Sequence, residues 1–230
     1  MMRFAEEILL LLRDEDGTLS RAPEWLVRYA LGGAVLMDLA LEDRIDTDAD
    51  RLFLIDSTPV EDRLLDPMLA EIAQADDTHD ALYWVDHAAR HAEEIREVAL
   101  ERLVGNGVLE LRDDRFLWIF GTRRYSLVDA GVERELKQRI GTVLSSDVIP
   151  DPRDIVIVTL ADGCGLLGHL LSAGELARAA PRIELVRKMD LIGRVFLAAM
   201  DVAVQPAAGR LDRSAPTAPP PARFAKHEDP

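Results

Sequence analysis

Apolar residues recur every three or four positions along most of the first 200 residues, the spacing that gathers side chains on one face of a helix. The clearest case is formed by Leu31, Val35, Leu36 and Leu39. Residues 105–107, Gly-Asn-Gly, follow the longest such pattern and are typical of a helix C-terminus. The pattern predicts helices at 4–13 (short and amphipathic), 24–40, 62–75, 79–104 and 130–144, with 154–161 and 174–199 completing a mainly α domain.

Two β-prone runs interrupt the helical pattern between residues 108 and 121. Residues 108–111 and 116–121 are rich in aliphatic and aromatic side chains and flank the polar segment 112–115. Such an arrangement predicts a β-hairpin that turns at the two aspartates of the polar segment. A separate run at 51–55 predicts one further short strand.

The last 28 residues differ from the rest, since they contain six prolines and seven alanines. This composition buries too little apolar surface to offset the entropy lost on ordering, so we expect a folded domain at 1–202 and a disordered tail at 203–230. Two acids precede the short first apolar run, which argues against a signal peptide. We therefore expect a cytoplasmic protein that touches a membrane only from outside, on its cytosolic face.

The chain carries 42 acidic and 27 basic residues, a net charge of −15. Proteins that coat nucleic acid replace phosphate counterions with basic residues, so this balance argues against a nucleic-acid partner. The single cysteine, Cys164, excludes an internal disulfide and a thiolate metal cluster.

Residues 163–168 match the glycine pattern G-x-G-x-x-G and follow the β-branched run 155–158. In dinucleotide-binding folds such glycines let the backbone approach a pyrophosphate, and Glu184 lies near where a ribose-binding acid would be expected. The alternative, which we favour, is a buried helix in which small residues allow close contact. A nucleotide-binding domain would require a parallel strand at 155–159, and we predict no cofactor.

His87 and His91 are four residues apart on one predicted helix, and Glu94 follows three residues later. Side chains at this spacing share a helix face and could hold a metal ion. Two histidines on a solvated helix face explain the pattern equally well, and no thiolate or H-E-x-x-H motif supports a metal. We predict no metal site.

Residues 112–139 contain seven basic and five acidic residues, whereas the rest of the chain is strongly acidic. The same segment holds a cluster of aromatic residues: Phe116, Trp118, Phe120 and Tyr125. Arginines near anionic lipid headgroups contribute about 1 kcal/mol each, so a hairpin of this kind can contact a membrane. The alternative is a core hairpin whose Phe116, Trp118 and Phe120 point inward.

Several segments, taken in order, resemble the Golgi phosphoprotein 3 family over about residues 4–200. They are FAEEILLL at 4–11, LGGAVLMDLAL at 31–41, DSTP at 56–59 with LLD at 64–66, RLVGNGVL at 102–109, and the hairpin. The resemblance implies a single helical domain with amphipathic outer helices and one protruding hairpin. It also implies a non-enzymatic peripheral membrane protein that binds phosphatidylinositol 4-phosphate, acts as an adaptor for protein clients, and inserts or self-associates through the hairpin.

The family's headgroup pocket, as the resemblance implies it, uses one tryptophan and three arginines. The corresponding positions here are Pro23, Gly32, Glu93 and Arg96, so only Arg96 is retained, with Trp25 as a nearby substitute. An acid at position 93 would repel a phosphate group. We predict lipid-binding residues Trp25, Arg96, Arg123 and Arg124, and an insertion or oligomerisation segment of Leu117, Trp118, Ile119 and Phe120.

Three hypotheses about function are open at this point. The first is a peripheral membrane protein that binds an anionic phospholipid headgroup. The second is a protein-interaction module in which the hairpin forms a homo-oligomer or receives a protein client. The third is a nucleotide-dependent enzyme that uses the glycines of residues 163–168.

Overall fold

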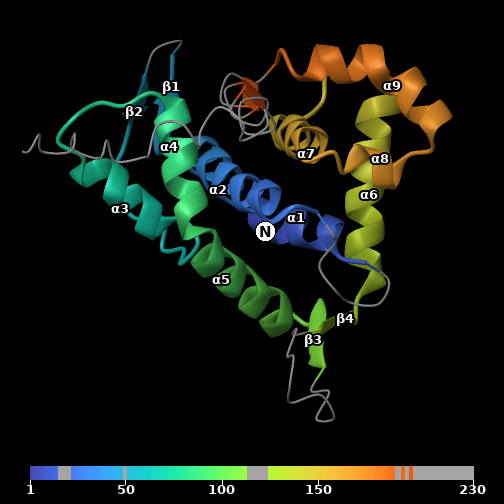
Figure 1. The fold of residues 1–230 in the computed structure, drawn as a ribbon, viewed down its shortest axis with the longest axis horizontal. Helices are drawn as coiled ribbons and strands as arrows, with labels where there is room; N and C mark the ends of the chain where they lie inside the picture. The colour runs from blue at the N-terminus through green and yellow to red at the C-terminus, as the bar shows by residue number, and fades with distance from the viewer. Residues whose placement is uncertain (15–21, 49–50, 113–123, 190–192, 195–196, 199–230) are drawn as a thin grey trace, which may run out of the picture.

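The computed structural model of the chain describes residues 1–14, 22–48, 51–112, 124–189, 193–194 and 197–198. This part is mainly helical, as predicted, with two small antiparallel sheets (Figure 1). Its helices are α1 (Phe4–Leu12), α2 (Glu24–Leu41), α3 (Asp66–Gln74), α4 (Ala81–Ala88), η1 (Ala89–His91), α5 (Ala92–Gly105), α6 (Ala130–Ser145), α7 (Pro152–Gly163), α8 (Leu167–Leu170) and α9 (Ala173–Val186). Within these residues, every helix is too short or too polar to span a lipid bilayer.

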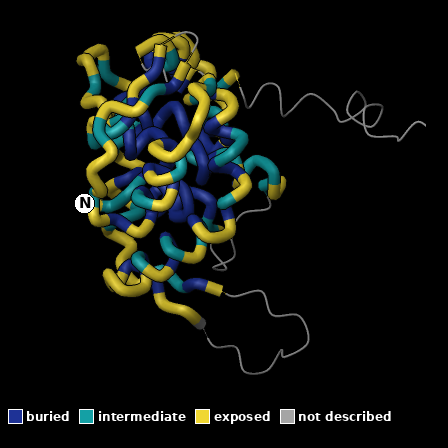
Figure 2. The backbone as a smooth tube through the Cα atoms, turned by 90° about the vertical axis from the view of Figure 1, so that its left-hand side faces the viewer, coloured by how far each residue is buried: buried dark blue, intermediate teal, exposed yellow. Residues whose placement is uncertain are grey.

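Helix α1 lies in the middle of the molecule, beside α2, and all of its residues are buried (Figures 1 and 2). The prediction that this helix is amphipathic is therefore wrong, because Glu6 and Glu7 are inaccessible as well. Buried carboxylates are tolerated when they are paired, and arginines from other helices supply the partners. Arg102 of α5 lies 3.3 Å from Glu6, and Arg139 of α6 lies 3.0 Å from Glu7.

The long helix predicted at 79–104 is divided into α4, the 3-10 turn η1 and α5, and α4 and α5 run in different directions in Figure 1. The predicted helix at 62–75 begins later, as α3 at Asp66. The carboxylate of Asp66 accepts hydrogen bonds from the backbone N–H groups of Val60 and Asp62, at 2.8 and 3.0 Å. These bonds hold the preceding segment in a loop.

The two sheets are hairpins of short strands. In the first, β1 (Ile45–Thr47) pairs with β2 (Leu52–Leu54), which confirms the predicted short strand and adds a partner that the sequence did not reveal. In the second, β3 (Leu109–Arg112) pairs with β4 (Arg124–Leu127), with Leu111 opposite Tyr125. The predicted pairing of 108–111 with 116–121 is wrong, because residues 109–112 pair with 124–127; residues 116–121 themselves lie outside the described residues.

This second hairpin lies at one end of the molecule, beyond α5 (Figure 1). Leu109 and Tyr125 are buried against the core, and this burial fixes which segments pair. Residues 113–123, which include Leu117, Trp118, Ile119, Phe120 and Arg123, lie outside the described residues.

Residues 152–163 form helix α7, so the parallel strand required by a nucleotide-binding domain is replaced by a helix. The glycine motif falls on the turn between α7 and α8, where Gly165 has φ 68° and permits the reversal. The hypothesis of a nucleotide-dependent enzyme is therefore overturned. Cys164 is buried beside this turn, and burial raises the pKa of its thiol to about 12, so the thiol stays protonated at neutral pH.

Candidate anion-binding and histidine sites

Arg96, the arginine that the resemblance predicts for a headgroup pocket, is held by two carboxylates. Its Nη1 lies 2.8 Å from Oε1 of Glu93, and its Nη2 lies 2.9 Å from Oε1 of Glu24, the first residue of α2. Only 17% of the Arg96 side chain is exposed. Two negative charges beside one guanidinium leave no net attraction for a phosphate group.

Two helices approach each other closely at Gly32, the position for which the resemblance implies an arginine in the family. A Cβ atom at Gly32 would lie 2.7 Å from the backbone N of Ala89 and 2.9 Å from the carbonyl carbon of Ala88. Real Cβ atoms do not come this close to backbone. Helix α2 therefore packs directly against the end of α4 and the start of η1, and no side chain fits between them.

A pocket of about 300 Å³ lies between α2 and the α4–η1 segment, close to this contact. Its lining comprises Trp25, Arg28, Tyr29, Asp86, Ala89 and Arg90. Nε of Arg28 donates a hydrogen bond to the carbonyl of Ala89 at 3.2 Å, and the hydroxyl of Tyr29 donates one to Asp86. Arg28 and Arg90 are exposed, and in the part of the chain that the structure describes neither is paired with a carboxylate.

Of the predicted lipid-binding residues, Trp25 lines this pocket and Arg96 does not. Sequence reasoning missed Arg28 and Arg90. Trp25 and Arg28 are three residues apart on α2 and so share a face. This spacing could have identified Arg28 from the sequence. Arg90 comes from a distant part of the chain, and only the packing of α2 against η1 brings it to the same pocket.

Arg124, another predicted lipid-binding residue, lies at the start of β4 and is exposed. It stands opposite Arg112 in the hairpin register. The hairpin also exposes apolar side chains, since Leu111 is 46% and Val128 60% accessible. Its described part therefore combines a basic residue with apolar surface at one end of the molecule.

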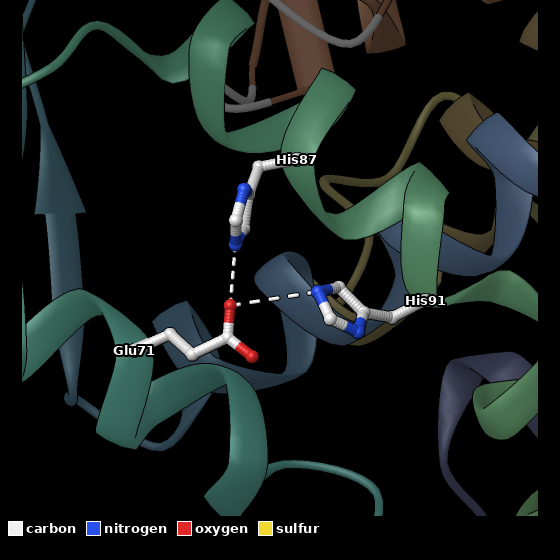
Figure 3. A group of neighbouring side chains, drawn as sticks. All are labelled: Glu71, His87 and His91. Carbon is white, nitrogen blue, oxygen red and sulfur yellow. Dashed lines mark hydrogen bonds and ion pairs between the residues drawn. The ribbon is translucent and has the colours of Figure 1, made fainter.

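The histidines singled out from the sequence converge on a residue of a different helix. Nε2 of His87 and Nε2 of His91 both point at Oε2 of Glu71, which belongs to α3 (Figure 3). The His91 contact is 3.5 Å, and one ligand atom of each of the three residues lies within 4.8 Å of the others. Glu94, the acid expected from spacing, is not part of this cluster.

The interior carries a second set of charged groups, around the N-terminus of α1. Asp38 of α2 accepts a hydrogen bond from the backbone N–H of Phe4 at 2.8 Å, and Arg153 of α7 lies 3.5 Å from its other oxygen. Burial raises the pKa of Asp38 to about 7, although the Phe4 bond and the charges of Arg153 and Arg3 act in the opposite direction. Arg153 also contacts Glu7 at 3.3 Å and lies 4.2 Å over the ring of Phe4.

The fold and these sites together define a mainly helical domain with a buried ionic centre, one basic aromatic pocket and a small terminal hairpin. The chain belongs to the Golgi phosphoprotein 3 family, whose family model matches residues 4–207. It is also similar to vacuolar protein sorting-associated protein 74 of Eremothecium gossypii, with 26% identity over 203 residues. That match covers 73% of this chain, and the chain spans about 60% of the relative's length.

Proposed function

We propose that this protein is a non-enzymatic peripheral membrane protein that binds an anionic phospholipid headgroup on a cytosolic membrane face. The observation that carries the proposal is the pocket in which Arg28 and Arg90 are exposed and have no carboxylate partner among the residues that the structure describes. Family membership supports the same class of function. The headgroup would therefore contact this pocket and not the neighbouring Arg96.

The charges around Arg96 and in the pocket on α2 favour the pocket as the headgroup site. A phosphomonoester carries close to two negative charges, and paired arginine forks are well suited to bind it. Arg28 and Arg90 supply two positive charges against the one acid that lines the pocket, Asp86, which accepts a hydrogen bond from the hydroxyl of Tyr29. Trp25 and Tyr29 add an aromatic wall on which an inositol ring or a glycerol backbone can pack.

The hairpin supplies a second membrane contact in this proposal. Exposed Arg124 would meet anionic headgroups, and exposed Leu111 and Val128 would meet the interface. Residues 117–120 and Arg123 belong to the proposed contact on sequence grounds alone. The expected tail at 203–230 has no part in it.

Vesicle co-sedimentation tests the proposal. The full chain is mixed with vesicles of neutral phosphatidylcholine, with and without phosphatidylinositol 4-phosphate or phosphatidylserine. We expect pelleting only with anionic lipid, and weakening of at least about tenfold when both Arg28 and Arg90 are changed to Gln, because each arginine near headgroups contributes about 1 kcal/mol. The exposed Arg63, paired with Glu101 outside the pocket, provides the control variant Arg63→Gln. Equal pelleting with neutral lipid, or equal loss in both variants, would contradict the proposal.

The exposed Leu111 and Val128 also favour a second function, self-association or capture of a protein client through the hairpin. Exposed apolar side chains on such a protruding element are available for contact with another protein. Light scattering separates the two functions in the absence of lipid. A stable oligomer that is lost in a Leu111→Ser, Val128→Ser variant supports self-association. A monomer instead supports the membrane as the surface that the hairpin contacts.

A further inference from the structure

The cluster of Glu71, His87 and His91 has no role in the proposed headgroup site, and its geometry is that of a ligand set. The two imidazoles come from α4 and η1, whereas the carboxylate comes from α3, and all three face one point (Figure 3). We propose that these three side chains bind one divalent transition-metal ion, with zinc as the ion that the donor set suits best.

The distances fit a tetrahedral ion after a small adjustment. Zinc bonds to imidazole nitrogen and carboxylate oxygen at about 2.0–2.2 Å, which places neighbouring ligand atoms about 3.3 Å apart in a tetrahedron. Nε2 of His91 and Oε2 of Glu71 already lie 3.5 Å apart. Nε2 of His87 is in direct hydrogen-bond contact with the same oxygen, so this contact must lengthen to admit the ion.

The donor types decide which ion is preferred. Two imidazoles and one carboxylate form a nitrogen-rich set, which suits zinc, copper or nickel, whereas calcium and magnesium prefer oxygen ligands alone. Histidine-two, carboxylate-one sets with three protein ligands leave a fourth position for water or another small ligand. The three residues are half-buried, so water can reach that fourth position.

The imidazole of His87 is oriented by aromatic neighbours. The ring of Tyr83 stacks on it at 5.9 Å with an interplanar angle of 11°, and Trp84 packs edge-on at 5.4 Å. Among the described residues, Nδ1 of His87 is buried without a hydrogen-bond partner, so the neighbouring rings direct its Nε2 toward Glu71. Tyr83 and His87 are four residues apart on α4, and His91 follows in η1; a metal ion would join both elements to α3.

His91 and Glu71 also line an apolar pocket of about 230 Å³ with Met68, Ile95 and Val98. Because Glu71 and His91 line both the cluster and this pocket, an ion held by the cluster would lie at the edge of the pocket. A small ligand with a metal-binding head and an apolar body would therefore be accommodated there. This pocket and the headgroup pocket share no residue.

Metal binding is tested on the full chain, produced without a histidine tag and stripped with a chelator. Titration with Zn²⁺ by calorimetry should give one ion per chain, and Co²⁺ should give the visible absorption of a tetrahedral site. Glu71→Gln and His91→Gln should each weaken Zn²⁺ binding at least tenfold. His169→Gln, which alters an exposed histidine outside the cluster, should leave affinity within twofold of the unaltered chain.

A stability readout separates loss of the site from loss of the fold. Saturating Zn²⁺ should raise the thermal unfolding temperature of the unaltered chain by mass action and leave that of His91→Gln unchanged, while both unfold alike without metal. Stoichiometry below 0.2 ions per chain, or equal affinity in His91→Gln and His169→Gln, would overturn the proposal. Vesicle binding by the metal-free chain tests the headgroup proposal separately.

Discussion

Arginines of this protein act differently in its interior and at the pocket on α2. Around α1, Arg102, Arg139 and Arg153 each lie within 4 Å of a buried or nearly buried carboxylate, so their charges are used to hold helices together. At the pocket, Arg28 and Arg90 have no such partner among the described residues. The number of arginines therefore says little about anion binding, because the carboxylates beside each arginine determine how much positive charge remains for a ligand.

The largest expected effect comes from breaking the interior network. Arg153→Met leaves Glu7 and Asp38 with one arginine fewer in a buried setting, and removing one partner of a buried ion pair costs roughly 3–5 kcal/mol. Urea unfolding followed by circular dichroism measures this loss. The control Arg63→Met removes an exposed pair, worth about 0–1 kcal/mol. If the two variants lost the same stability, the interior pairs would have no special role.

A second prediction concerns Gly32, the position for which the resemblance implies an arginine in the family. Gly32→Arg should destabilise the fold by about 1–3 kcal/mol through overpacking against Ala88 and Ala89 and should not strengthen binding to anionic vesicles. Gly168→Ala is the control, because nothing lies within 4 Å of a Cβ atom at Gly168. Stronger vesicle binding by a stable Gly32→Arg variant would show that the family pocket is still open here.

The buried carboxyl group of Asp38 should make the stability of the fold depend on pH. Because the folded pKa of Asp38 is about 7 against an ordinary 3.8, the native state binds more protons than the unfolded chain between these values. The free energy of unfolding contributed by Asp38 is therefore highest below pH 4 and falls as pH rises through 7, by at most about 1.4 kcal/mol per pH unit. The free energy of unfolding is measured against pH for the unaltered chain and for Asp38→Asn, and the difference between the two isolates this slope. A flat difference between pH 4 and 7 would show that Asp38 titrates normally.

The smallest effect is expected at Arg96. Glu93→Gln removes one of its two carboxylate partners, and a change of one charge near anionic headgroups is worth about 1 kcal/mol. Binding to anionic vesicles should therefore strengthen about fivefold. Glu97→Gln, on the same helix and also exposed, controls for the general loss of negative charge. Equal gains in both variants would mean that Arg96 plays no local part.

The sequence predicted the helical class and most helix positions because periodic apolar residues report burial directly. It was wrong about α1, since the arginines that make Glu6 and Glu7 tolerable in the interior come from α5, α6 and α7. It gave 108–111 the wrong strand partner, because β3 pairs with 124–127, where Tyr125 is buried together with Leu109. Partners that come from distant segments of the chain do not appear in local sequence patterns.

The same reason limits what the sequence revealed about the sites. Trp25 was identified from its position near the family's tryptophan, and His87 with His91 from their four-residue spacing. Arg90 and Glu71, which complete the two clusters, come from other elements and were missed. Local spacing identifies the half of a site that one helix carries, and the packing of neighbouring helices supplies the rest.

The most direct test of the central claim compares two variants in one vesicle-binding assay. If the pocket on α2 binds the headgroup, changing both Arg28 and Arg90 to Gln should weaken binding to vesicles containing phosphatidylinositol 4-phosphate at least about tenfold, since each arginine contributes about 1 kcal/mol. Arg96→Gln should change it less than about twofold, because its charge is already compensated by Glu24 and Glu93. A larger loss in Arg96→Gln than in the double variant would contradict the account.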